Sequence, residues 1–162
     1  MKHKLIIFAL ITALIYVVLG NIVACTSTET PCLTISEQNY NATLANHASR
    51  VGEESIELAY LLEEPQMEND EWRIDVDTKL TTIRMLYDEA LEIEPTSSMA
   101  HIHDKYLQAM YHYDIAIELV AEGIDTQNSN LLDQAVSEME LGIEDMEEAT
   151  RLMDDFITAR CP

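Results

Sequence analysis

The sequence has little glycine and little proline: four residues of each type occur among 162. After residue 24 it has no long β-branched runs and no Asn-Gly turns, which are the signals of strands and hairpins. Good helix formers such as Ala, Leu, Met and Glu are common instead. The composition therefore predicts a helical chain.

Basic residues are also scarce. The chain has 9 Lys and Arg against 30 Asp and Glu, and its formal net charge is −21. Without Lys2 and Lys4 the charge is 7 − 30 = −23. Such a surface repels nucleic acids, so we do not expect nucleic-acid binding. It attracts cations, basic peptides or basic proteins; alternatively, the acidity only keeps an exported helical protein soluble.

Catalytic and cofactor motifs are missing from the sequence. There is no Gly-x-Ser-x-Gly, no Ser-x-x-Lys and no Cys-x-x-Cys-His. The only glycines after residue 24 are Gly52, Gly123 and Gly142, too few for a phosphate-binding loop. No His follows a Glu by three residues, so the motif of carboxylate di-metal bundles is absent. We expect neither an enzyme nor a bound cofactor.

The first 24 residues have the pattern of a secretory signal peptide. A basic start with Lys2 and Lys4 precedes Leu5–Leu19, which is apolar apart from one threonine, and the small residue Ala24 ends the segment. Alternatively, residues 5–24 are long enough to cross a bilayer as an uncleaved helix. Under either interpretation the basic residues hold the N-terminus inside, so residues from 25 onward lie outside the cytoplasm.

The end of this segment, Ile22-Val23-Ala24-Cys25, resembles a prokaryotic lipobox. The run from Pro95 to Gly142 is also similar to a pattern in small prokaryotic lipoproteins with a single α-helical domain. The resemblance implies that the Cys25 thiol accepts a diacylglycerol and that cleavage makes this residue the new N-terminus. Two acyl chains give stable anchoring at the cell membrane. Residues 25–33 would then form a tether, and the resemblance implies no particular activity.

A lipid on Cys25 leaves Cys32 and Cys161 as the remaining cysteines. An even remainder in an exported chain favours a disulfide between them. Two free buried thiols are the alternative.

Apolar residues recur at alternating steps of three and four in four segments, which is typical of helices with one buried face. The expected helices cover residues 36–63, 70–93, 97–123 and 128–159. The predicted buried positions are Leu44, Ala48, Val51, Ser55, Leu58 and Leu62 in the first; Trp72, Val76, Leu80, Ile83, Tyr87 and Ala90 in the second; Met99, Ile102, Tyr106, Ala109, Tyr113, Ala116 and Val120 in the third; and Leu132, Val136, Met139, Ile143, Met146, Thr150, Met153 and Ile157 in the fourth.

The ends of these helices have recognisable signals. Pro65 and Pro95 end the first and second helices, because the residue before a proline avoids the α conformation. Asn69 or Asp70 is expected to cap the second helix, and Ser97 or Ser98 the third. Gly123 is placed where a glycine often ends a helix.

Long helices joined by short linkers fold back on their neighbours. We therefore expect residues 34–162 to form one all-α domain, an antiparallel up-down-up-down four-helix bundle. In that topology Cys32 and Cys161 lie at the same end, which independently favours their disulfide. The bond would stabilise the fold by up to ~4–5 kcal/mol.

Two further site predictions come from short motifs. Met99, His101 and His103 place three soft-metal ligands within five residues, and such a cluster in an exported protein can bind copper. Alternatively, the methionine fills the core and His101 faces solvent. Asn41 begins an Asn-Ala-Thr glycosylation sequon. We expect a membrane-anchored lipoprotein that presents an acidic surface to a cationic or protein partner, with a copper-binding bundle as the alternative.

Overall fold

A computed structural model describes residues 32–161, so the predicted signal peptide, the tether before Cys32 and Pro162 lie outside the described residues. The described residues form four helices and no strands, which confirms the predicted all-α class and the number of helices. The helices are α2 (Ile35–Glu63), α3 (Asp70–Glu92), α4 (Ala100–Asp125) and α5 (Ser129–Arg160). Within residues 32–161 no helix is both long enough and apolar enough to cross a bilayer.

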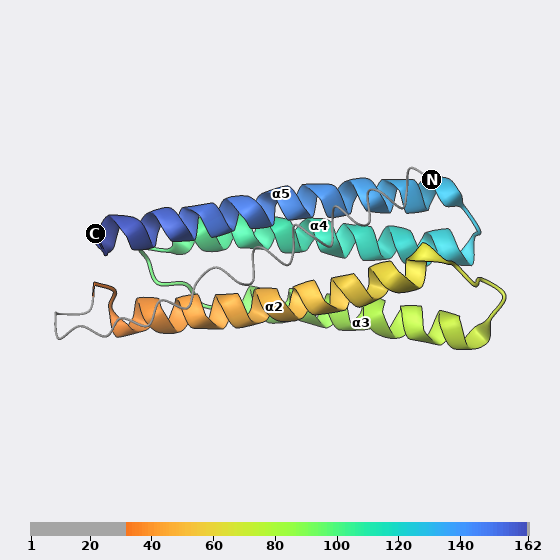
Figure 1. Cartoon of the computed structure of the whole chain (residues 1–162), viewed down its shortest axis with the longest axis horizontal. Coiled ribbons are helices and arrows are strands. Elements are labelled where there is room, and N and C mark those ends of the chain that lie inside the picture. Colours follow the sequence, from red (N-terminus) through yellow and green to blue (C-terminus); the bar gives the residue numbers. More distant parts are fainter. Residues whose placement is uncertain (1–31, 162) are drawn as a thin grey trace.

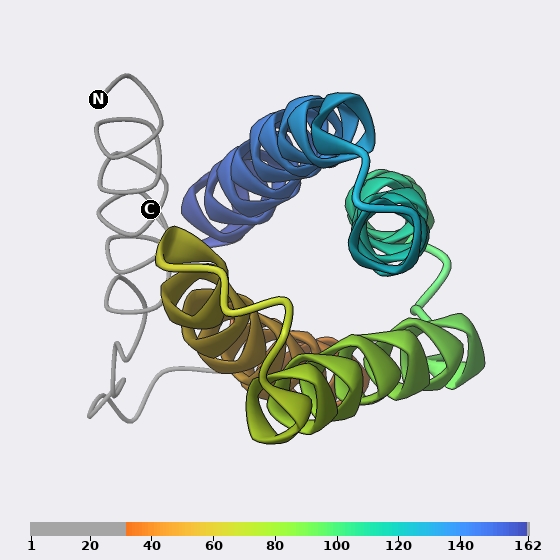
Figure 2. The ribbon, with the colours of Figure 1, turned by 90° about the vertical axis from the view of Figure 1, so that its right-hand side faces the viewer.

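The four helices lie side by side along one long axis, and successive helices run in opposite directions (Figure 1). Viewed along that axis, they follow one another around a ring in sequence order (Figure 2). α4 and α5 pack most closely, whereas within their described ranges no Cα of α2 lies within 8 Å of a Cα of α5. The first and last helices of the ring are therefore joined by side chains rather than by close backbone packing.

The helix starts differ in how they are capped. Asn69 caps α3, as predicted, because its side chain accepts hydrogen bonds from the backbone N–H groups of Glu71 and Trp72. The prediction that Ser97 or Ser98 caps α4 is wrong. Met99 is the N-cap residue and makes no side-chain capping bond. Ser98 Oγ instead donates to Glu37 Oε1 at 2.8 Å, across to α2.

The end of α4 also differs from the prediction. Gly123 lies inside the helix, where a Cβ would come within 2.8 Å of Leu132 Cδ2. The left-handed residue is Gln127, with φ 52°. The Asn128 N–H bonds to the Gly123 carbonyl and the Gln127 N–H to the Ile124 carbonyl, which is a Schellman ending. Gly123 is therefore needed for packing, and a non-glycine residue adopts the strained turn conformation.

The core is one apolar cluster along the bundle. The predicted positions of α3 and α4 are buried except Tyr87, which is partly buried while its neighbour Leu86 lies in the core. Two predicted faces are displaced. On α2, His47 is buried and Ala48 only partly so. On α5, Met146 and Met153 are buried as predicted, but Ala135, Gly142 and Ala149 are buried in place of their predicted neighbours Val136, Ile143 and Thr150, which are partly buried. A Cβ on Gly142 would lie 3.2 Å from the Ala109 carbonyl oxygen, so small residues on this face let α4 and α5 approach closely.

Candidate binding groove

A groove of about 700 Å³ lies between the N-terminal half of α2 and the end of α3 with the loop that follows. This volume is in the range of small-ligand and cofactor sites. Its lining residues from α2 are Ser36, Asn39, Tyr40, Thr43, Asn46, His47 and Arg50; those from α3 and the loop are Glu89, Glu92, Ile93, Glu94, Pro95 and Thr96. The groove therefore has one wall rich in uncharged polar groups and one wall rich in carboxylates.

The charges in the groove do not balance. Arg50 Nη1 lies 2.5 Å from Glu89 Oε2, and this guanidinium holds the pKa of Glu89 below its usual range. No Lys or Arg among the described residues forms an ion pair with Glu92 or Glu94. The lining charge is thus one arginine against three glutamates, or −2.

Two tyrosine–histidine pairs lie beneath the groove and connect α2 to α4. The Tyr40 hydroxyl lies 3.1 Å from His103 Nδ1, and the Tyr106 hydroxyl lies 2.5 Å from His47 Nδ1. All four side chains are at least nine-tenths buried. Each helix contributes one tyrosine and one histidine, so these pairs form a polar layer within an otherwise apolar core.

His47 is the histidine that reaches the groove. Its Nε2 is buried without a hydrogen bond, although Glu89 Oε2 lies 4.0 Å away and the Leu86 carbonyl is close enough to act on its pKa. Burial lowers the pKa of His47, and it lowers the pKa of His103 in the same way. Both rings are therefore neutral at pH 7. We assign the proton of neutral His47 to Nε2, on the side of Glu89, so that the Tyr106 hydroxyl donates to Nδ1.

The tyrosine hydroxyls are kept in their protonated form. Burial raises the pKa values of Tyr40, Tyr106 and Tyr113. The pKa of Tyr106 is raised further by its electrostatic interaction with the other two tyrosines. The Tyr113 hydroxyl is buried without a partner, as is Ser55 Oγ. Tyr113 therefore differs from Tyr40 and Tyr106, whose hydroxyls each bond to a histidine.

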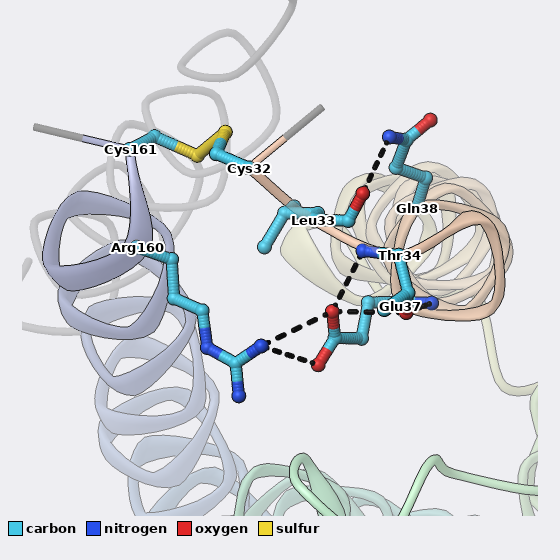
Figure 3. Close-up of a disulfide and its surroundings, with 7 residues drawn as sticks. All are labelled: Cys32, Leu33, Thr34, Glu37, Gln38, Arg160 and Cys161. Carbon is cyan, nitrogen blue, oxygen red and sulfur yellow. Dashed lines mark hydrogen bonds and ion pairs between the residues drawn. A yellow bond between two sulfur atoms is a disulfide. The ribbon is translucent and has the colours of Figure 1, made fainter. Parts of the chain in front are cut away.

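The groove adjoins the end of the molecule where the two termini of the domain meet. The Sγ atoms of Cys32 and Cys161, the pair predicted from the sequence, lie at disulfide distance, and their Cα atoms are 5.3 Å apart (Figure 3). Beside them, the carboxylate of Glu37 accepts from the Thr34 N–H at 2.9 Å and pairs with Arg160 of α5 at 3.1 Å. The Thr34 N–H lowers the pKa of Glu37 most strongly.

The other predicted site residues are dispersed. Met99 is fully buried, His101 is exposed and His103 is paired with Tyr40, so the three differ in environment. Among residues 32–161 no cluster of three His, Cys, Asp or Glu side chains is arranged to hold a metal ion. Asn41 is half-buried on α2. Cys25 lies outside the described residues.

Sequence reasoning missed the groove because it placed Ala48, not His47, on the buried face of α2. The spacing Tyr40, Leu44, His47, Val51 also alternates four and three, so a signal was present. Glu89 carried no such signal, because its partner Arg50 lies on another helix. For Glu37, the Thr34-x-x-Glu37 capping box was readable in the sequence, but the contacts with Ser98 and Arg160 were not.

Comparison of the chain with models of known protein families, with curated proteins and with solved structures found no match.

Proposed function

We propose that this protein is a lipid-anchored lipoprotein, exposed outside the cytoplasm, whose antiparallel helical bundle binds a cationic partner. The observation that carries the proposal is the acidic groove beside the Cys32–Cys161 end. The lipobox-like sequence at Cys25 supports the location, and the surplus of carboxylates supports the sign of the partner's charge.

The ion pairs of the bundle also favour a cationic partner. Each of the seven Lys and Arg residues among residues 32–161 already contacts a carboxylate. Within this range every Lys and Arg side chain therefore already has a carboxylate partner. Most of the 29 acidic residues in this range have no basic partner, so long-range attraction acts on cations.

The position of the groove fits a protein held close to a membrane. If Cys25 carries the lipid, the seven residue steps to Cys32 reach at most about 25 Å. Ser36, at one end of the groove, follows Cys32 by four residues. A partner in the groove would therefore be held near the bilayer surface.

Two measurements test the proposal. Mass spectrometry of the native protein should find a diacylated residue 25 at the N-terminus. The full chain in phosphatidylcholine vesicles should bind poly-L-lysine and not poly-L-glutamate, with affinity that falls as salt is added. An unmodified residue 25 would contradict the anchor, and equal binding of both polymers would contradict the cationic partner. Copper binding through Met99, His101 and His103 remains a prediction from the sequence.

A further inference from the structure

The α2 wall of the groove carries a row of uncharged polar side chains, which attraction between charges alone would not require. Along its α2 wall, Ser36, Asn39, Thr43 and Asn46 follow one another at steps of three, four and three. We call these four residues the polar stripe. They lie on one face of the helix, are all exposed, and make no side-chain hydrogen bond within residues 32–161. The stripe therefore offers amide and hydroxyl groups to a ligand.

Three other threonines of the bundle behave differently from Thr43. Thr78 and Thr82 on α3 and Thr150 on α5 each donate to the carbonyl four residues earlier in their own helix. Thr43 makes no such bond. Its hydroxyl is thus free to donate and accept within the groove.

The opposite wall carries the charge. Glu92 and Glu94 are exposed carboxylates with no basic partner in the described chain. Between the walls, His47 is 5% exposed and its Nε2 has no hydrogen bond. A carbonyl oxygen of a bound ligand would supply the hydrogen bond that this buried N–H lacks. The Arg50–Glu89 pair lies next to it and would have to move aside.

We propose that the groove binds an extended segment of a basic peptide, with its backbone along the polar stripe and its cationic side chains at Glu92 and Glu94. This proposal rests on the proposed function and names its site. Backbone carbonyl and N–H groups match the amides and hydroxyls of the stripe, and one carbonyl accepts from His47 Nε2. From Ser36 to Arg50 the helix rises about 21 Å, which is the length of about six residues of extended chain.

The test uses the full chain in phosphatidylcholine vesicles, with N-acetylated hexalysine amide as the ligand and calorimetry at low ionic strength. Glu92→Gln/Glu94→Gln should weaken binding roughly fivefold to tenfold. Glu140→Gln/Glu144→Gln changes the charge equally at exposed positions of α5 and should have little effect. Asn39→Ala/Asn46→Ala removes two amides of the stripe without changing the charge and should weaken binding roughly threefold or more.

The possible outcomes separate the two proposals. Equal weakening by both glutamine pairs would overturn the groove as the site while leaving a cationic partner intact. No binding to the unaltered chain would overturn both proposals. If 1,5-diaminopentane binds as tightly as the peptide, or if the asparagine variant binds normally, recognition of a peptide backbone is overturned.

Discussion

α2 and α5 are the first and last helices of the bundle, and they are held to it by different chemistry. The buried residues of α5 are all small or apolar, and its ion pairs with α4, among them Lys105–Asp145 and His112–Glu138, involve partly exposed side chains. α2 buries Glu37, Tyr40 and His47, and two of these bond to buried residues of α4: Tyr40 to His103 and His47 to Tyr106. Apolar packing is indifferent to pH, whereas buried histidines respond to it, and the disulfide that joins the start of α2 to the end of α5 responds to redox state. The candidate groove lies along α2.

The largest expected effect is at the covalent link. Changing Cys32 and Cys161 to serine should lower the free energy of unfolding by about 3–5 kcal/mol, because the bond closes a long loop in the unfolded chain. The two cysteines are 129 positions apart. Urea denaturation followed by the fluorescence of Trp72, which is buried at the start of α3, measures the loss. An unchanged midpoint would mean that the termini are not joined in the native protein.

The α5 side of the comparison depends on close backbone approach. Gly142→Leu should cost about 2–3 kcal/mol, because the side chain must displace the Ala109 carbonyl and Tyr113. Glu140→Leu places the same side chain on the exposed face of α5 and should change stability by less than about 0.5 kcal/mol. Equal losses in the two variants would show that the contact with α4 is not what matters.

The α2 side depends on buried hydrogen bonds. Tyr106→Phe leaves His47 Nδ1 buried without a partner and should cost about 1–3 kcal/mol. Tyr113→Phe is the matched control, because that hydroxyl is buried and already lacks a partner. It should be neutral or slightly stabilising. If both variants lose the same stability, the tyrosine–histidine pairs do not support α2.

The same pairs should make stability depend on pH. Burial lowers the pKa values of His47 and His103, so the folded state binds fewer protons than the unfolded state, whose histidines titrate near pH 6.5. Stability should therefore fall as the pH is lowered from 7 towards 5. Glu37 and Glu89, whose pKa values are lowered, contribute losses mainly below about pH 4.5.

Urea denaturation at pH 7.5 and 5.5 measures this dependence. His47→Gln/His103→Gln should flatten it even if the variant is less stable overall, because the slope reports only the titrating groups. If the variant's free energy of unfolding changes with pH as much as that of the unaltered chain, groups other than His47 and His103 cause the pH dependence.

The smallest effect is at the turn between α4 and α5. Gln127 has φ 52°, which costs a residue with a Cβ more than it costs glycine. Gln127→Gly should raise the free energy of unfolding by roughly 0.5 kcal/mol, because the steric strain removed with the Cβ exceeds the extra conformational entropy that glycine loses on folding. Gln127→Ala keeps the Cβ and should give no gain. If the glycine variant is no more stable than the alanine variant, the turn is unstrained.

The sequence predicted well whatever depends on one helix at a time. Pro65 and Pro95 marked the linkers, so the helix bounds agree within about three residues, and the Cys32–Cys161 pair followed from the topology. The failures involve contacts between helices. Ser98 is a good capping residue but bonds to Glu37 instead, and the face of α5 is set by how closely its glycine approaches α4.

The groove belongs to this second class. Nothing in the spacing within α2 says that His47 will meet Tyr106, because that pairing depends on the relative register of two helices that are separated by α3. Likewise, the sequence does not show that Glu92 and Glu94 lie across a groove from the polar stripe, because that arrangement depends on how α3 packs against α2.

The central claim is that the N-terminal half of α2 depends on buried, hydrogen-bonded histidines and tyrosines, whereas α5 buries only small or apolar residues and forms its ion pairs with α4 through partly exposed side chains. Amide hydrogen exchange at pH 7.5 and 5.5, corrected for the intrinsic rates, tests it helix by helix. Residues 35–50 should lose protection at the lower pH while residues 135–153 keep theirs. An equal loss in both segments, or a loss confined to α5, would contradict the account.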